Sequence, residues 1–134
     1  KPDVAVLAAN EVVNPKMPVT VDAQALTEMS RRGELPEAVV EGPIAMDVAL
    51  SPAAATHKNL SSQISGQVDL FLVPDISAGN ILGKSLIHYG KFKSAGVILG
   101  ATHPVVMVSR ADTAEAKLNS IALACCIASD KGGN

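Results

Sequence analysis

Short apolar runs recur along the chain, separated by longer stretches in which apolar residues return at helical spacing. Apolar or β-branched runs at residues 4–7, 38–40, 68–73, 95–99 and 105–108 are typical of buried strands, and a Gly-Pro pair is expected to break the second of them. Strands that are apolar throughout belong to mostly parallel sheets that helices cover. The sequence therefore predicts an α/β fold with a mostly parallel sheet flanked by helices.

Two helices are expected in the first half of the chain. The first ends at about residue 32, with Thr20 or Asp22 as its N-terminal cap and Gly33 as its stop. The second spans residues 52–57, where a serine precedes the helix as its cap and a proline takes its first position. Both helices lie between predicted strands, as the crossover connections of a parallel sheet require.

The longest predicted helix lies near the end of the chain, and a further helix is expected over about residues 77–89. Asp112 or Thr113 can cap the long helix, Glu115 can satisfy its first turn as in a capping box, and the helix extends to about Ser129. Its apolar residues recur at helical spacing and are expected to face the core: Ala114, Leu118, Ile121, Ala122 and Cys125.

The composition excludes several functions. The chain has 134 residues, 48% of them apolar, but its net charge of -2 and its 2% of aromatic residues provide neither a basic surface nor stacking platforms for nucleic acids. The only cysteines are the adjacent Cys125 and Cys126, and no signal peptide or apolar run of about 20 residues is present, so a cytoplasmic protein without membrane contact is expected. His57, His88 and His103 show no metal-ligand spacing, so no metal is predicted.

The first candidate for chemistry follows a predicted strand, because ligands of open α/β sheets bind past the carboxyl ends of the strands. In residues 73–80 a strand ends, Asp75 follows, and a turn of small residues opens a helix. Gly79 would allow close approach of a ligand or of another segment, and the helix amides could hold an anion. The alternative is that Asp75 simply caps the helix and Gly79 eases packing.

The second candidate precedes the long helix. Ser109 and Arg110 could bind a phosphate or a thioester oxygen, because the helix N-terminus is positive and an arginine can bind two oxygens at once. The alternative is a surface Arg110 that pairs with Asp112 or Glu115. A third candidate, His103, lies in a glycine-bounded loop and could be a base or a turn residue.

Four motifs together resemble one family. They fall in the family's order and at similar spacings: Glu41-Gly42-Pro43-Ile44-Ala45-Met46-Asp47, Val73-Pro74-Asp75-Ile76-Ser77-Ala78-Gly79-Asn80, Leu82-Gly83-Lys84 and Ser109-Arg110-Ala111-Asp112. The chain resembles the phosphate acetyl/butyryltransferase family over nearly its whole length, and the butyryl branch more than the acetyl branch. The Pro-Asp-x-x-Ala-Gly-Asn turn combined with a later Ser-Arg pair before a helix is specific.

The resemblance implies where this chain belongs in a larger fold. Family members have two α/β domains with an isocitrate/isopropylmalate dehydrogenase-like architecture, hold the active site in the cleft and commonly form homodimers. Family chains are much longer, so this chain is expected to correspond to their C-terminal part. About residues 1–104 would form most of one domain, and about residues 105–134 would add a strand and a helix that pack back on the other domain.

The resemblance also implies the reaction, in which acyl-CoA and phosphate give acyl phosphate and CoA, with a butyryl-like short acyl group. A carboxylate removes the proton of the CoA thiol, while Ser109 and Arg110 stabilise the developing charge and the leaving phosphate. Acetyl-type members place the candidate base seven residues beyond the serine, where this chain has Ala116, so Asp112 or Glu115 would serve. The implied substrate-binding residues are Asp75, Gly79, Asn80 and Lys84.

Two other functions stay open from the sequence. The chain could be a truncated, non-catalytic fragment that binds CoA or phosphate at the Ser109-Arg110 helix end. A relative of the isopropylmalate-type dehydrogenases would need an Asp cluster for a metal and a Gly-rich nicotinamide fingerprint, and the sequence has neither. No cofactor is expected, because coenzyme A is a substrate. The expected partners are CoA, acyl-CoA, phosphate, acyl phosphate and a second copy of the chain.

Overall fold

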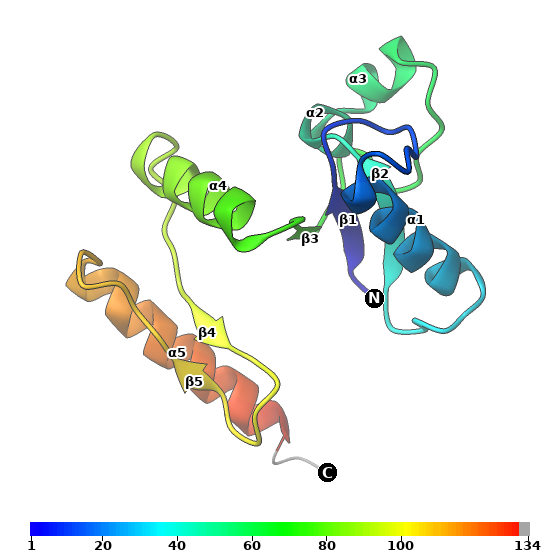
Figure 1. The fold of residues 1–134 in the computed structure, drawn as a ribbon. Coiled ribbons are helices and arrows are strands. Elements are labelled where there is room, and N and C mark those ends of the chain that lie inside the picture. Colours follow the sequence, from blue (N-terminus) through cyan, green and yellow to red (C-terminus); the bar gives the residue numbers. More distant parts are fainter. Residues whose placement is uncertain (132–134) are drawn as a thin grey trace. The chain divides into compact units, whose positions relative to one another are not determined.

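The computed structural model describes residues 1–131. The chain divides into two compact units, Lys1–Ile81 and Leu82–Asn134, and helix α4 begins in the first and ends in the second. The elements follow one another in this order (Figure 1): β1 Asp3–Leu7, α1 Pro18–Arg31, β2 Val39–Ile44, α2 Met46–Leu50, α3 Pro52–His57, β3 Leu70–Leu72, α4 Ile76–His88, β4 Val97–Ile98, β5 Val105–Val106 and α5 Ala114–Lys131.

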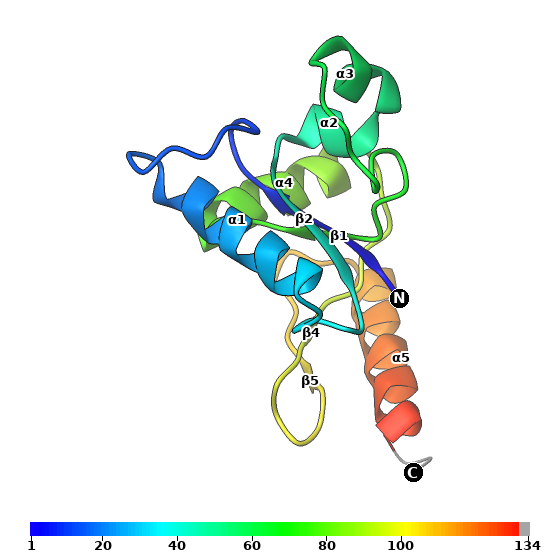
Figure 2. The ribbon, with the colours of Figure 1, turned by 90° about the vertical axis from the view of Figure 1, so that its right-hand side faces the viewer.

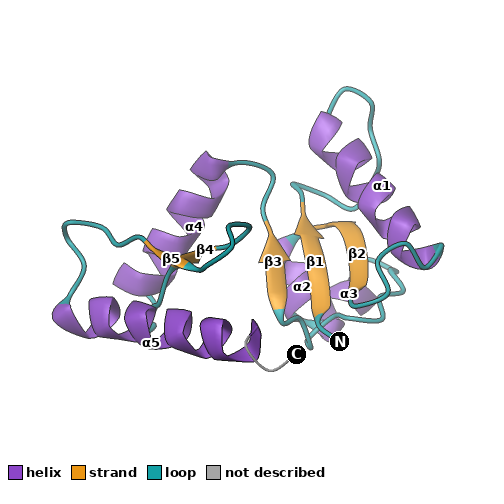
Figure 3. Cartoon of the chain, turned by 90° about the horizontal axis from the view of Figure 1, so that it is seen from below, coloured by secondary structure: helices purple, strands orange, loops and turns teal. Residues whose placement is uncertain are grey.

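The first unit is built on a three-stranded parallel sheet in the order β2-β1-β3 (Figure 3). Val4 in the central strand pairs with Val40 on one side and with Leu70 on the other. Because parallel strands need crossover connections, α1 joins β1 to β2, and α2 and α3 lie between β2 and β3. The predicted α/β fold with a parallel sheet is confirmed in this unit.

Aliphatic side chains form the core of the first unit. Val6, Ala23 and Val40 are buried together, and Leu26 and Leu35 pack against them. Burial of one such valine or leucine side chain stabilises the fold by about 1.5–3 kcal/mol. The remaining buried apolar residues of this unit are Ala5, Leu7, Ile44, Val48, Ala49, Ala55 and Ile64.

Helix α1 begins earlier than the sequence predicts. Its first residue is Pro18, and Met17 takes the capping position without a side-chain hydrogen bond. Thr20 is fully buried inside the first turn, where its Oγ1 accepts the N–H of Asn14 at 2.9 Å and donates to the Met17 carbonyl at 2.8 Å. The prediction that Thr20 or Asp22 precedes the helix is therefore wrong, because the threonine binds the loop rather than a helix N–H.

Strand β2 continues through the Gly42-Pro43 pair, so the predicted break is wrong. The peptide bond between these two residues is cis, and the pairing with β1 shifts register between Ala5 and Leu7. Beyond the register shift, Leu7 still pairs with Ile44, and the N–H of Ala8 donates to the Ile44 carbonyl at 3.0 Å. The register shift thus absorbs the proline without ending the strand.

Two short helices follow β2 (Figure 2). Helix α3 begins as predicted, with Pro52 at its first position and the Ser51 side chain accepting the N–H of Ala54 at 3.4 Å. Helix α2 was not predicted, because five residues, Met46–Leu50, are too few to show a helical period.

Strands β4 and β5 of the second unit form a two-stranded antiparallel sheet. Val97 pairs with Val106 and Ile98 pairs with Val105. The sequence predicts both runs as members of a mostly parallel sheet, and that expectation is wrong for this pair. The connection between them is short, and such a connection joins antiparallel neighbours, whereas parallel neighbours need a crossover of a dozen or more residues.

Helix α5 packs on this antiparallel pair through the small side chains of Ser120 and Ala124, which are buried. Ser120 Oγ accepts the N–H of Gly96, next to β4, at 2.9 Å. The residues predicted to face the core lie elsewhere on the helix and are exposed, for example Leu118 at 66% and Ile121 at 52%. The prediction is wrong for this chain because β4 and β5 contact a different face of α5.

Candidate active site

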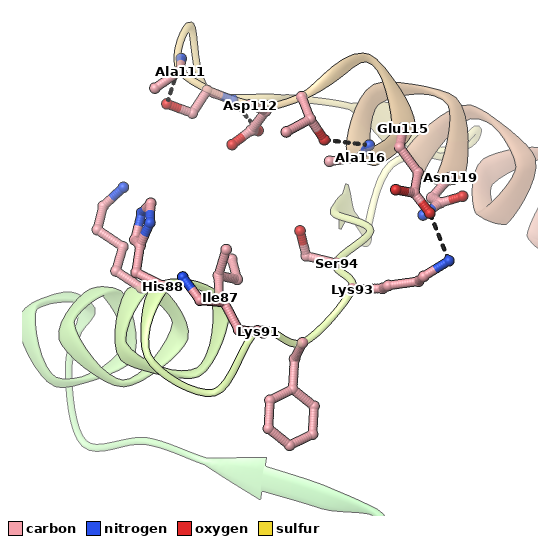
Figure 4. Close-up of a pocket in the computed structure, with 14 residues that line it drawn as sticks. Ile87, His88, Lys91, Lys93, Ser94, Ala111, Asp112, Glu115, Ala116 and Asn119 are labelled. Carbon is pink, nitrogen blue, oxygen red and sulfur yellow. Dashed lines mark hydrogen bonds and ion pairs between the residues drawn. The ribbon is translucent and has the colours of Figure 1, made fainter.

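The second unit contains a cavity of about 430 Å³ that collects four of the predicted site residues, Lys84, Ser109, Asp112 and Glu115. In Figure 4, side chains from the end of α4 and from the segment after it face side chains at the start of α5. The lining residues are Lys84, Ile87, His88, Lys91, Phe92, Lys93, Ser94, Ser109, Ala111, Asp112, Thr113, Glu115, Ala116 and Asn119.

A closed turn holds Ser109 at the edge of this cavity. Asp112 Oδ2 accepts the N–H of Ser109 at 2.7 Å, and the Asp112 N–H donates to the Ser109 carbonyl at 3.1 Å. Ser109 Oγ in turn accepts the N–H of Ala111 at 3.4 Å. Thr113 Oγ1 accepts the N–H of Ala116 at 3.1 Å, so Thr113 caps α5 while Asp112 closes the turn before it.

Glu115 pairs with a lysine from the segment after α4. Its Oε1 lies 2.7 Å from Lys93 Nζ, with both side chains more than half exposed. The hydrogen bond to the Glu115 carboxylate raises the pKa of Lys93 above its ordinary value. The predicted capping-box role of Glu115 is therefore not observed, because its carboxylate faces Lys93 rather than a helix N–H.

Arg110 is exposed and is not among the lining residues, although Ser109 and Ala111 on either side of it are. Within residues 1–131, Arg110 forms no ion pair with Asp112 or Glu115. The alternative of a surface arginine neutralised by these carboxylates is therefore not observed. Arg110 thus lies between two lining residues, and its guanidinium has no acidic partner among the described residues.

The other predicted binding residues lie in the first unit: Asp75 lies between β3 and α4, and Gly79 and Asn80 lie near the start of α4. Asp75 Oδ1 accepts the N–H of Ala78 at 2.8 Å, which closes the first turn of α4. A Cβ atom on Gly79 would lie only 2.9 Å from Val73 Cγ2, so the glycine permits a close contact. Capping and packing, the alternative explanation of these residues, are thus both observed. Asn80 is exposed, and a role toward a ligand stays a prediction.

The sequence did not single out several basic residues of the cavity. His88, one of the three histidines without metal-ligand spacing, is exposed and lines the cavity together with Lys91 and Lys93. The sequence contains one signal that indicates these basic residues. Lys84 and His88 are four residues apart on α4 and therefore share a helix face, and two lysines follow within five residues. A basic stripe that runs into a loop is typical of a site for an anion.

None of the helices within residues 1–131 combines the length and the apolar character needed to cross a bilayer. In the same residues, no three histidine, cysteine, aspartate or glutamate side chains gather as they would around a metal ion.

Solved structures of phosphotransacylases resemble this fold. A branched-chain phosphotransacylase from Enterococcus faecalis V583 superposes with a TM-score of 0.81 at 42% identity, over 92% of this chain and 44% of that chain. A phosphotransacetylase from Streptococcus pyogenes superposes with a TM-score of 0.80 at 28% identity, over 96% of this chain and 39% of that chain. Fold and sequence thus agree on one class of protein.

Curated relatives give the same result. Phosphate butyryltransferase of Clostridium acetobutylicum is 48% identical over 97% of this chain and 43% of the relative. Phosphate acetyltransferase of Thermotoga maritima is 49% identical over 91% of this chain and 42% of the relative. The family model described as phosphate acetyl/butaryl transferase matches residues 1–125, and the chain belongs to this family. The chain spans less than half the length of these curated relatives.

Proposed function

We propose that this chain carries catalytic residues of an enzyme that exchanges a short, butyryl-like acyl group between coenzyme A and inorganic phosphate. The observation that supports it best is the cavity, which brings Lys84, Ser109, Asp112 and Glu115 together in a chain of the phosphate acetyl/butaryl transferase family. Both substrates are anions, and the lysines of the cavity suit them. Coenzyme A enters as a substrate, so the proposed reaction needs no resident cofactor.

The reaction is a direct transfer within a ternary complex. A carboxylate takes the proton of the CoA thiol, and the sulfur attacks the carbonyl carbon of the acyl phosphate. The new carbon–sulfur bond forms, the carbon–oxygen bond to phosphate breaks, and phosphate leaves with the electron pair. Ser109 and Arg110 donate hydrogen bonds to the developing oxyanion and to the leaving phosphate, with Lys84 as a further cation. Such preorganised donors are usually the largest catalytic contribution.

Glu115 is the proposed base. Asp112 already accepts the N–H of Ser109 and holds the turn, whereas the partner of Glu115 is the exposed and flexible Lys93. A base must reach the proton that it removes, and a surface lysine can move away when CoA enters. Asp112 is then a positioning residue for Ser109.

Substitution separates the two carboxylates. Glu115→Gln should lower turnover by about 10²–10⁴-fold and remove the acid limb of the pH–rate profile, because the amide cannot accept the thiol proton. Asp112→Asn should keep that limb while weakening turnover less. Stopped-flow rates of thioester formation between pH 5 and pH 9 test which carboxylate is the base. Loss of the acid limb in Asp112→Asn alone would make Asp112 the base and Glu115 the positioning residue.

Asp75, Gly79 and Asn80 are proposed to contact substrate at the first unit's sheet edge. They follow β3, and the carboxyl ends of parallel strands are where open α/β sheets bind ligands. Asp75 caps α4 through one carboxylate oxygen, which leaves the other oxygen for a ligand donor. Asn80 is exposed and offers both a donor and an acceptor.

The finer architecture belongs to the same proposal. The whole protein would have two α/β domains of the isocitrate/isopropylmalate dehydrogenase type, work in the cytoplasm and form a homodimer. About residues 1–104 would belong mostly to one domain, and about residues 105–134 would pack back on the other. The exposed apolar residues of α5, among them Leu118 and Ile121, support a helix that further chain covers. Light scattering on the full-length protein tests the dimer.

The direct test of the reaction is thioester formation from CoA and a series of acyl phosphates, acetyl through valeryl, followed by absorbance with the full-length protein. Activity with a maximum near butyryl phosphate is expected. Retained CoA binding without activity would instead favour the second candidate, a protein that binds coenzyme A without catalysis. Neither binding nor activity would contradict both.

A further inference from the structure

A lysine of the first unit joins the segments that follow two neighbouring strands. Lys58 comes directly after α3, and its Nζ lies 3.0 Å from Glu11 Oε1. The same nitrogen lies 3.0 Å from Asp47 Oδ2 and 3.2 Å from Asp47 Oδ1. Glu11 lies in the loop after β1, and Asp47 lies in the first turn of α2, just after β2. One ammonium group therefore connects the carboxyl ends of β1 and β2.

The loop after β1 depends on this contact. Within it, Asn10 Oδ1 accepts the N–H of Val12 at 3.1 Å, and further along Asn14 is bound to Thr20 of α1. Within the described part of the chain, residues 9–13 form a single hydrogen bond or ion pair with an element other than α1 and its cap. That one long-range polar contact is the ion pair between Glu11 and Lys58.

The ion pair between Lys58 and Glu11 is less exposed to solvent than an ordinary surface ion pair. The Glu11 side chain is only 15% exposed, whereas the Lys58 side chain is 39% exposed. Exposed pairs contribute little because water and salt screen them, and a largely buried carboxylate with a shared cation is screened less. The hydrogen bonds that Lys58 donates to the Glu11 and Asp47 carboxylates raise the pKa of Lys58, so the ammonium stays charged at neutral pH.

The loop also lies at the sheet edge where a substrate is proposed to bind. β1 is the central strand, and its Val6 pairs with Leu72 of β3. Parallel neighbours end at the same edge, so the loop after β1 begins at the edge where residues 73–75 lead from β3 into α4. Open α/β sheets bind their ligands at this edge.

We propose that Lys58 is a positioning residue that holds the loop of residues 8–13 against α2, so that substrate binds at an ordered sheet edge. This proposal rests on the proposed function, in which Asp75, Gly79 and Asn80 contact substrate at this edge. Lys58 does not touch the reacting atoms and acts through Glu11. Without it, only a fraction of the molecules has the loop in place, and the apparent dissociation constant rises by the inverse of that fraction while bound substrate reacts at the normal rate.

The kinetic test compares four variants of the full-length protein with butyryl phosphate and CoA. Lys58→Met should raise KM by about 3- to 10-fold, with kcat within about twofold of wild type. Lys58→Arg should restore KM, because a guanidinium keeps the charge and can bind both Asp47 oxygens. Glu11→Gln should raise KM as Lys58→Met does, and the double variant should be no worse than Lys58→Met, since both remove one interaction.

A matched control removes an exposed ion pair at the far end of α1. Arg32 pairs with Glu28 and Glu34, and both partners are about half exposed. Arg32→Met should leave KM and kcat unchanged. A KM for Lys58→Met equal to that of this control, or a loss confined to kcat, would overturn the positioning role.

Hydrogen–deuterium exchange of a peptide covering residues 8–17 gives a readout that needs no activity. Lys58→Met should exchange faster in this peptide than wild type, and Lys58→Arg should not. Unchanged exchange would overturn the proposal even if KM rises. An inactive wild-type enzyme would refute the acyl transfer, and the exchange result would still decide whether Lys58 holds the loop.

Discussion

The two units of this chain contrast in how they bury their apolar residues. The first unit encloses its own core, with Val6, Val48 and Ile64 nearly inaccessible to water. In the second unit, Ala124 is the one buried apolar residue among those described, while Leu118 stays 66% exposed. The candidate active site cavity lies in the second unit, which lacks a closed core of its own. The candidate catalytic residues Ser109, Asp112 and Glu115 are therefore proposed to act from the less enclosed unit.

This contrast explains why the apolar pattern of the sequence matches the observed packing in the first unit but not in the second. In the first unit, the apolar pattern and the packing agree, because the buried side chains pack against one another within the same unit. In the second unit, the pattern of α5 marks an apolar face that residues 82–131 do not cover. The proposed two-domain enzyme accounts for that face, since further chain would pack there.

The largest effect on stability is expected in the first unit. Ile64 is fully buried, so Ile64→Ala should lower the free energy of unfolding by about 2–5 kcal/mol through lost burial and a cavity. Leu118→Ala should change it by less than about 0.5 kcal/mol in the 134-residue chain. Urea denaturation of both variants measures the difference. Equal losses of unfolding free energy in the two variants would contradict the contrast in burial between the units, because Leu118 would then be buried.

A smaller effect is expected where the first unit meets its candidate binding turn. Gly79→Ala places a methyl group 2.9 Å from Val73 Cγ2, and a β-branched side chain has little freedom to turn away. Overpacking of this kind costs about 1–3 kcal/mol. Thermal unfolding measures the cost, and Ser85→Ala, elsewhere on α4, serves as a control. A neutral Gly79→Ala would contradict the packing role of the glycine.

The smallest effects are expected from exposed charges, and they fall at opposite ends of the pH scale. The hydrogen bond from Lys58 lowers the pKa of Asp47 in the first unit, so its contribution is present above the unfolded pKa and is lost as pH falls below about 4. Glu115 raises the pKa of Lys93 in the second unit, so that contribution is lost as pH rises beyond about 10.5.

Melting temperatures measured across the pH range check this pair of expectations. Asp47→Asn should differ from wild type at neutral pH and converge with it in acid. Lys93→Met should differ at neutral pH and converge in alkali. Convergence of Asp47→Asn only in alkali would contradict the sign derived for the carboxylate.

The sequence predicted the features that depend on neighbouring residues. Ser51 caps α3 and Thr113 caps α5 because a hydroxyl reaches an N–H three residues away. The hydrogen bond between Ser109 and Asp112, three residues apart in one turn, is equally local, but it was not predicted. A family resemblance brought Lys84 into the same candidate site, and the cavity contains it.

Features that depend on tertiary contacts could not be predicted. Helical spacing shows that α5 has an apolar face, but it does not tell which face another segment covers. The contact between Glu11 and Lys58 joins residues 47 positions apart, and no local pattern encodes it. Strand β2 passes Gly42-Pro43 because of its register with β1, which the strand's own residues do not reveal.

The measurement that tests the central claim most directly is the turnover of full-length Arg110→Ala in thioester formation from CoA and butyryl phosphate, with Arg32→Ala as the control. Arg110 lies beside the cavity without an acidic partner among the described residues, so it is expected to bind the developing charge. Its loss should lower kcat by about 10²-fold or more, while the control keeps wild-type turnover. Equal turnover of wild type and Arg110→Ala would contradict the assignment of catalysis to this part of the chain.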